Sequence, residues 1–182
     1  MATGWYPDRL RLHPVAALME RDTSTDAAPR IAVEDPAQPE IIELLRDGEA
    51  HSAELYPAES NHHLPLVALR EPHVRFLVAR DERGRAIATG ALVRHGFWAE
   101  LKRMWVVPEA RGRGVSKAML AVIEAEARNE NVRILRLETG VASHAALGLY
   151  ARSGFRRRGP FGEYRADPLS VFMEKELAER SE

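Results

Sequence analysis

The feature that most constrains the fold of this chain is a basic turn with two glycines, which joins an apolar strand to an amphipathic helix. Residues 101–108, LKRMWVVP, have the composition of a strand that ends at a proline. After the turn, apolar side chains recur every three or four residues from Val115 to Ile123, which is the spacing of one helix face. Glycine lets backbone N–H groups approach a ligand closely, and a helix N-terminus carries about half a positive charge. The junction therefore predicts a cradle for a pyrophosphate group.

Of the three phosphate-binding loops that such a turn could form, two do not fit the sequence. A Walker loop requires G-x-x-x-x-G-K-[ST], which no stretch satisfies, and a dinucleotide-binding turn requires a third glycine where Lys117 stands. The third pattern, R/Q-x-x-G-x-G/A, holds the pyrophosphate of coenzyme A, and here Ser116 takes its last place. On this segment alone, an ordinary basic turn remains the alternative. The cofactor-binding residues predicted in the turn are Arg111, Gly112, Arg113, Gly114, Val115, Ser116 and Lys117.

A second motif identifies a family resemblance. Residues 143–155, SHAALGLYARSGF, resemble the N-x-A-A-x-x-L-Y-x-x-x-G-F signature of the GNAT superfamily of acyl-CoA-dependent N-acetyltransferases, with Ser143 in place of the usual Asn. The resemblance covers roughly residues 31–177. Within it, LETG at 137–140, PAES at 57–60 and GPFGEY at 159–164 are similar to a bacterial subgroup of small-molecule acetyltransferases. The resemblance implies acetyl-CoA as the acyl donor. It also implies a mixed α/β fold, with a mostly antiparallel central sheet, a splayed strand pair and helices on both faces.

The rest of the chain is consistent with one such domain. We expect residues 1–30 to be an N-terminal extension or docking arm, which ends in the linker TSTDAAP at 23–29, and residues 31–182 to be the acetyltransferase domain. Expected strands are 31–34, 74–79, 86–93, 99–107, 132–138, one near 155 and one near 170–175. Expected helices are 39–55, one that ends near 69, one from the turn to about 129, and 143–153.

Composition excludes several classes of function. The chain has 182 residues, 45% hydrophobic and 29% charged, which suits one globular domain with a sizeable core. A formal net charge of −1 gives no field that favours nucleic acid or an anionic membrane. The absence of cysteine excludes disulfides, thiolate metal sites and a cysteine nucleophile. Charged residues near the N-terminus and the lack of a long apolar run favour a cytoplasmic protein.

N-acetylation requires a base, because an alkylamine with a pKa near 10.4 is only about one part in 10³ deprotonated at pH 7. Two carboxylates match positions of the base in branches of the superfamily. Glu100 matches the histone-acetylating branch, and Glu138 matches the ribosomal-protein-acetylating branch. We favour Glu100, because its strand also holds the pantetheine arm. The alternative is that one of them is an exposed or salt-bridged glutamate at a strand end, with Lys102 or Arg103 as its partner.

The resemblance also assigns an acid and the contacts of the pantetheine arm. Tyr150 stands at the family's tyrosine position and would protonate the leaving thiolate, although a core aromatic is the alternative. Ser143 is shorter than the usual Asn, so its contact with the arm is lost or passes through water. Backbone groups of Met104, Trp105 and Val106 would bind the pantetheine amides like an added strand.

The acceptor pocket is expected between the first two helices and the last two strands. Glu59 could hold an ammonium, Arg103 or Arg75 could hold a carboxylate, and Ser60 and Tyr164 complete the predicted substrate-binding set. An equal alternative is that Ser60 or Asn61 caps the second helix. No further ligand accompanies His62 and His63, so no metal site is expected.

The sequence thus predicts a cytoplasmic N-acetyltransferase that moves an acetyl group from acetyl-CoA to a small-molecule amine or amino acid. A homodimer is compatible with this prediction. One rival is an acetyltransferase of protein N-termini or lysines, and another is a catalytically silent acyl-CoA-binding sensor.

Overall fold

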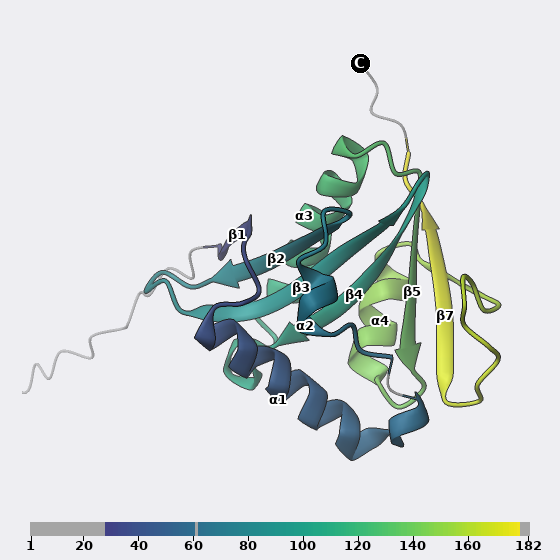
Figure 1. Ribbon diagram of the computed structural model, residues 1–182, viewed down its shortest axis with the longest axis horizontal. Helices are drawn as coiled ribbons and strands as arrows, with labels where there is room; N and C mark the ends of the chain where they lie inside the picture. Colours follow the sequence, from purple (N-terminus) through teal and green to yellow (C-terminus); the bar gives the residue numbers. More distant parts are fainter. Residues whose placement is uncertain (1–27, 61, 179–182) are drawn as a thin grey trace, which may run out of the picture.

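The chain folds around one seven-stranded sheet. The computed structural model describes residues 28–60 and 62–178 (Figure 1). The strands are β1 (Arg30–Val33), β2 (Val74–Arg80), β3 (Ala86–His95), β4 (Trp98–Val106), β5 (Ile134–Gly140), β6 (Arg156–Arg158) and β7 (Ser170–Glu176). The helices are α1 (Pro39–Leu55), α2 (Leu66–Leu69), α3 (Val115–Asn129) and α4 (His144–Arg152), with 3₁₀ turns η1 (Ala58–Ser60) and η2 (Pro108–Ala110).

The strand order is β1-β2-β3-β4-β5-β7-β6, and the only parallel neighbours among the described strands are β4 and β5. Helix α3 makes the crossover between these two strands, as a parallel pair requires. The predicted mixed, mostly antiparallel α/β sheet is therefore confirmed.

The two parallel strands separate soon after they meet. They pair from Trp98↔Ile134 to Glu100↔Arg136, and no further pairing is present in the described part of the chain, although β4 runs on to Val106 and β5 to Gly140. The backbone groups that would have joined them are left for another partner. This opening is the splayed strand pair that the resemblance implied.

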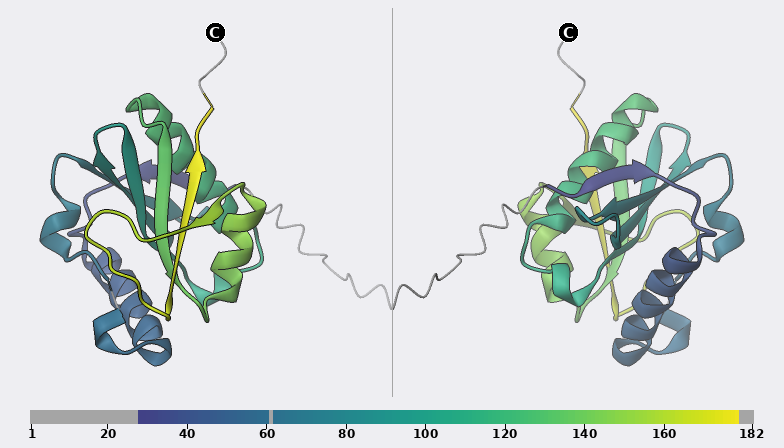
Figure 2. Two further views of the ribbon diagram at one scale, coloured as in Figure 1. Left: turned by 90° about the vertical axis from the view of Figure 1, so that its right-hand side faces the viewer. Right: turned by 90° about the vertical axis from the view of Figure 1, so that its left-hand side faces the viewer.

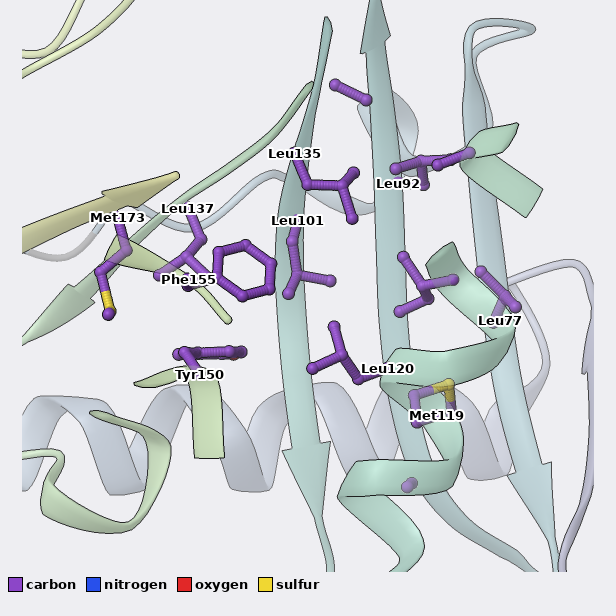
Figure 3. Close-up of a cluster of buried hydrophobic side chains, with 14 of the residues drawn as sticks. Leu77, Leu92, Leu101, Met119, Leu120, Leu135, Leu137, Tyr150, Phe155 and Met173 are labelled. Carbon is purple, nitrogen blue, oxygen red and sulfur yellow. The ribbon is translucent and has the colours of Figure 1, made fainter. Parts of the chain in front are cut away.

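Helices cover both faces of the sheet (Figures 1 and 2). On one face, α1 and α2 pack with Ile41, Leu45 and Leu69 against the core of β2 and β3. On the other face, α3 and α4 enclose a larger core, which contains Met119 of α3, Tyr150 of α4 and leucines from β2, β3, β4 and β5 (Figure 3). Alternation along a strand thus sends neighbouring residues of β4 and β5 to opposite faces.

Element boundaries differ modestly from the sequence expectation. The predicted second helix is a single turn, α2, with Pro65 as its N-cap residue and without a side-chain capping hydrogen bond, so the proposed capping by Ser60 is wrong. Asn61, the other candidate cap, lies outside the described residues. Residues 132–133 precede β5 rather than belonging to it, because Asn131 turns the chain with a φ of 58°. The predicted arm, residues 1–30, lies outside the described residues except for 28–30. Across residues 28–60 and 62–178, no helix combines the length and apolar character that crossing a bilayer requires.

Candidate active site

A cavity of about 660 Å³ extends through the opening between β4 and β5. One wall comes from α1 and the segment after it, with Leu45, Gly48 and Tyr56 among the lining residues. The opposite wall comes from the first turn of α3 and from α4 along most of its length. The cavity therefore connects the two faces of the sheet, and residues on each face can act on one ligand that lies between the strands.

A β-bulge shapes the β4 side of the opening. Arg103 and Met104 together face the single residue Gly90 of β3, and Arg103 has a φ of 57°. The Thr89 hydroxyl donates to the Arg103 carbonyl at 3.0 Å. A Cβ on Gly90 would lie 2.9 Å from the Met104 sulfur, so a larger residue at this position would require the Met104 side chain to move.

Beyond the bulge, alternate backbone groups of β4 face the opening. The Val107 N–H donates to the Ile87 carbonyl of β3. Because the backbone groups of alternate residues point to opposite sides of a strand, the N–H and C=O groups of Val106 and Met104 point toward β5. The Val106 carbonyl accepts a hydrogen bond from Arg111 Nε at 3.1 Å. Met104, Trp105 and Val106 all line the cavity, as predicted residues of the pantetheine-binding edge.

The glycine-containing turn closes one end of the cavity. Gly112 and Gly114 have φ values of 75° and 79°, a region that favours glycine, and α3 begins directly after them. The Arg111 guanidinium lies 4.8 Å from the centre of the Trp105 ring. Gly112, Val115 and Ser116 line the cavity, whereas Arg113, Gly114 and Lys117 are exposed outside its wall. The turn therefore places N–H groups of a helix start and basic side chains at one mouth of the cavity.

Tyr56, which the sequence did not single out, connects α1 to the turn before α4. Its hydroxyl accepts from Ala142 N–H at 3.0 Å and lies 3.0 Å from the Ser143 hydroxyl. The ring lies so close to Gly140 that a Cβ there would be 2.0 Å from the ring. Ser143 lines the cavity as predicted, but a residue from across the opening already engages its side chain.

Glu100 belongs to a hydrogen-bonded group of three side chains. Its Oε1 accepts from Lys102 Nζ at 3.1 Å and from the Tyr164 hydroxyl at 2.6 Å, and Lys102 also donates to that hydroxyl at 2.6 Å. Burial, followed by the charge and hydrogen bond of Glu100, raises the pKa of Tyr164, so the phenol keeps its proton. Lys102 was predicted only as one possible salt-bridge partner, and its contact with Tyr164 could not be read from the sequence because it joins residues 62 positions apart.

Glu138 faces the same cavity in a different environment. Its Oε1 accepts from the Ser170 hydroxyl at 2.7 Å. Burial raises the pKa of Glu138, and the nearby charge of Glu100 acts in the same direction. The structure therefore brings both candidate bases together, one tied to a lysine and a tyrosine and the other held by a single hydroxyl.

Tyr150 lines the cavity from the opposite face of the sheet. It is 5% exposed, and its ring packs 5.6 Å from that of Phe155 (Figure 3). Burial, and then the charge of Glu138, raises the pKa of Tyr150. The residue is thus both a core aromatic and a protonated phenol at the cavity, and its place in the core is compatible with the predicted role of acid.

The remaining predicted substrate residues divide into two groups. Ser60 and Arg103 line the cavity, and Tyr164 contacts it through Glu100. Glu59 is exposed outside the cavity wall, and Arg75 forms an ion pair with Glu130 beside a separate small pocket. Arg103, paired with Glu49 at 2.8 Å, is therefore the candidate of the two arginines that the fold brings to the site.

His62 and His63 also line the cavity without forming a metal centre. The described residues contain no group of three or more histidine, cysteine, aspartate or glutamate side chains that could hold an ion. Burial, and then the charge of Arg103, lowers the pKa of His63, which leaves this imidazole neutral near pH 7.

Known proteins are similar to this chain in sequence and in fold. The model of the acetyltransferase (GNAT) family matches residues 38–155. A relative from Azospirillum brasilense, named IAA acetyltransferase, is 46% identical over 149 residues, which cover 81% of this chain and 97% of the relative.

Two solved structures extend the comparison. A Klebsiella pneumoniae protein assigned as an acyl-CoA N-acyltransferase is 36% identical, with a TM-score of 0.71 over 82% of this chain and 98% of that one. The PaiA N-acetyltransferase of Thermoplasma acidophilum, solved with coenzyme A, has a TM-score of 0.63 over 81% of this chain and 99% of that one. At 18% identity, the second likeness shows the fold alone. From the family match over most of its sheet and the close relatives along four-fifths of its length, this chain belongs to the GNAT family of acetyltransferases.

Proposed function

We propose that the protein transfers an acetyl group from acetyl-CoA to the primary amine of a small molecule or amino acid. The observation that carries this proposal is a pair of contacts that narrow the cavity on the α1 face. Ser60 donates to Asp167 at 2.8 Å, and the His62 ring packs edge-on to Tyr164 at 5.1 Å. These contacts join the segment after α1 to the loop before β7, so they narrow the acceptor end. A narrow acceptor end suits a small molecule better than a protein segment.

The opposite end fits the predicted cosubstrate. The Gly112–Gly114 turn and the start of α3 suit a pyrophosphate, and the free edge at Met104 and Val106 suits the amides of a pantetheine arm. Coenzyme A bound to a structural neighbour with the same fold supports this assignment. Acetyl-CoA would supply the activated acyl group, and the chain would hold and orient it.

The environments of the two carboxylates suggest different roles. A general base works best when its pKa lies near the working pH, and burial raises the pKa of Glu138 in that direction. Glu100 already accepts hydrogen bonds from Lys102 and Tyr164. We therefore propose Glu138 as the base and Glu100 as the carboxylate that orients the acceptor, in place of the sequence preference for Glu100.

Tyr150 is the proposed acid. As the amine nitrogen forms its bond to the acyl carbon, the carbon–sulfur bond breaks and the sulfur requires a proton. The buried phenol keeps its proton across the working range and lies near enough to Glu138 for the charge of Glu138 to raise its pKa. The proton that Glu138 takes from the amine then balances the proton that Tyr150 gives to the sulfur.

The test is release of free thiol from acetyl-CoA in the presence of single acceptors. The panel contains amino acids, their decarboxylated amines, polyamines and a lysine-containing peptide. It also contains IAA, the compound in the name of the Azospirillum brasilense relative. We expect turnover with at least one small amine and a faster reaction than with the peptide. Turnover with the peptide alone would favour a protein acetyltransferase, and coenzyme A binding without thiol release on any acceptor would favour a sensor.

Two matched variants then assign the base. Glu138→Gln should lower kcat/KM by about 10²–10⁴-fold at neutral pH and recover at high pH, where the amine deprotonates without help. Glu100→Gln, the control on the neighbouring strand, should raise KM more than it lowers kcat. The reverse pattern would return the base to Glu100.

A further inference from the structure

Two buried hydrogen-bond donors in the cavity wall lack partners. The Nε–H of Arg103 and the indole Nε1–H of Trp105 have no acceptor among the described residues, and each nitrogen is closed to solvent. Leaving one such group unpaired costs about 1–3 kcal/mol, and native proteins rarely do so. Both donors belong to β4 and to residues that line the cavity. Two unpaired donors on one wall indicate a site for oxygen atoms of a ligand.

The bulge and an ion pair fix the orientation of Arg103. Its φ of 57° is costly for a residue other than glycine, and such backbone strain is concentrated at functional sites. Its Nη1 pairs with Glu49 at 2.8 Å, and its side chain is 5% exposed. A guanidinium also presents Nε–H and the neighbouring Nη2–H along one edge, which matches the two oxygens of a carboxylate. Glu49 therefore holds one end of the fork and leaves the Nε edge available.

The Trp105 indole packs against α1, the same helix that supplies Glu49 to Arg103. A Cβ on Gly48 would lie 3.3 Å from the indole, so helix and ring are in close contact, and the His51 ring lies 5.3 Å away. The side chains of Arg103 and Trp105 both contact α1, which is the face of the sheet that carries the acceptor end.

The charge around the site suits an anion. Lys102 already offsets the charge of Glu100, and the partner of Arg103, Glu49, has a half-exposed side chain that does not line the cavity. Arg103 also lies close enough to His63 for its charge to help lower the pKa of that imidazole, although Glu49 acts in the opposite direction.

From these contacts we infer that Arg103 Nε and Trp105 Nε1 bind the carboxylate of the acceptor, so that the acceptors are amino acids rather than simple amines. This inference rests on the proposed function and narrows it. The carboxylate would be held at the α1 face while the amine of the same molecule lies toward Glu100 and Glu138.

The kinetic test uses pairs of acceptors that differ only by a carboxylate, namely lysine and cadaverine, histidine and histamine, and phenylalanine and phenethylamine. Arg103→Lys keeps the charge without the fork, and Trp105→Phe keeps the ring without the N–H. Each variant should raise KM for the amino acids by about 10- to 100-fold and leave KM for the amines within about twofold. Arg136→Lys and Trp98→Phe, an ion-paired arginine and a β4 tryptophan outside the cavity wall, are the matched controls and should leave both values unchanged.

Two outcomes overturn the inference and leave the proposed function standing. One is a wild-type enzyme that acetylates amines and amino acids equally well. The other is that the two variants weaken the binding of amino acids and amines to the same extent, or weaken the binding of coenzyme A measured by calorimetry. The last result would place the donors on the cosubstrate instead of the acceptor.

A direct binding measurement does not depend on turnover. The chain has three tryptophans, and Trp105→Phe assigns the indole N–H resonance of Trp105 by its disappearance. With coenzyme A present, the three amino acids should shift this resonance, whereas their decarboxylated partners should not. A Trp105 resonance that none of the amino acids moves would refute the site even if no acceptor in the panel is acetylated.

Discussion

Gly140→Ala tests the contact that joins the acceptor side of the cavity to the cosubstrate side. A Cβ at this position would lie 2.0 Å from Tyr56 Cζ and 2.1 Å from its hydroxyl. Ordinary carbon contacts are about 3.5–4.0 Å, so the ring would have to move by about 1.5 Å. That movement separates the hydroxyl from Ala142 N–H and Ser143, both now at 3.0 Å.

The magnitude follows from these contacts. Two hydrogen bonds contribute about 0.5–1.5 kcal/mol each, so their loss costs about 1–3 kcal/mol. Replacing glycine with alanine stabilises the native state by about 0.5–1 kcal/mol, because it lowers the conformational entropy of the unfolded chain. The φ of Gly140 lies outside the positive region in which alanine would be strained. The net loss of unfolding free energy should be about 0–2.5 kcal/mol. In a Tyr56→Ala background the ring is absent, and the same substitution should be neutral or stabilising.

Urea denaturation of the four proteins in this cycle measures the coupling directly. Gly159→Ala is the control, because a Cβ there meets no atom within 4 Å. We expect the Gly140 and Tyr56 substitutions to be non-additive by about 1–3 kcal/mol. Additivity within about 0.5 kcal/mol would show that Tyr56 does not occupy the space beside Gly140, and the reasoning about the Ser143 turn would be wrong.

Three further predictions concern the site. Glu138→Gln should stabilise the protein above about pH 4.5 while lowering its activity. Because the pKa of Glu138 is raised in the native state, the native state binds this proton more tightly than the unfolded state does, and the wild type loses stability as the pH rises. Thermal unfolding of both proteins at pH 4 and pH 8 measures the difference. Tyr150→Phe should lower kcat and leave acetyl-CoA affinity nearly unchanged; turnover at the wild-type rate across pH 6–9 would make the residue packing alone. Reversing the charges of Arg113 and Lys117 together should weaken coenzyme A binding and flatten its salt dependence in calorimetry, and an unchanged affinity would remove the phosphates from this turn.

The sequence by itself determined the family, the glycine-containing turn before α3 and most of the helices and strands. These features are local: the two glycines before α3 and the periodicity from Val115 to Ile123 lie within a few residues of each other. A strand-to-helix turn depends on dihedral angles and helix-start charge, which neighbouring residues set. The resemblance at 143–155 likewise placed Tyr150 and Ser143 on the cavity wall before their partners were known.

The tertiary structure decided which of these residues are in contact and how their surroundings shift their pKa values. Glu100 and Glu138 both line the cavity, yet Lys102 and Tyr164 donate to Glu100 whereas the Ser170 hydroxyl donates to Glu138, and burial raises the pKa of Glu138. Arg75 and Arg103 were equal candidates until the sheet placed one beside Glu130 and the other in the cavity wall. Hydrogen bonds between residues 62 to 107 positions apart, such as that between Ser60 and Asp167, depend on the packing of loops against the sheet. A pKa depends on burial and on charges brought close in space, and neither is encoded by a residue's neighbours in the chain.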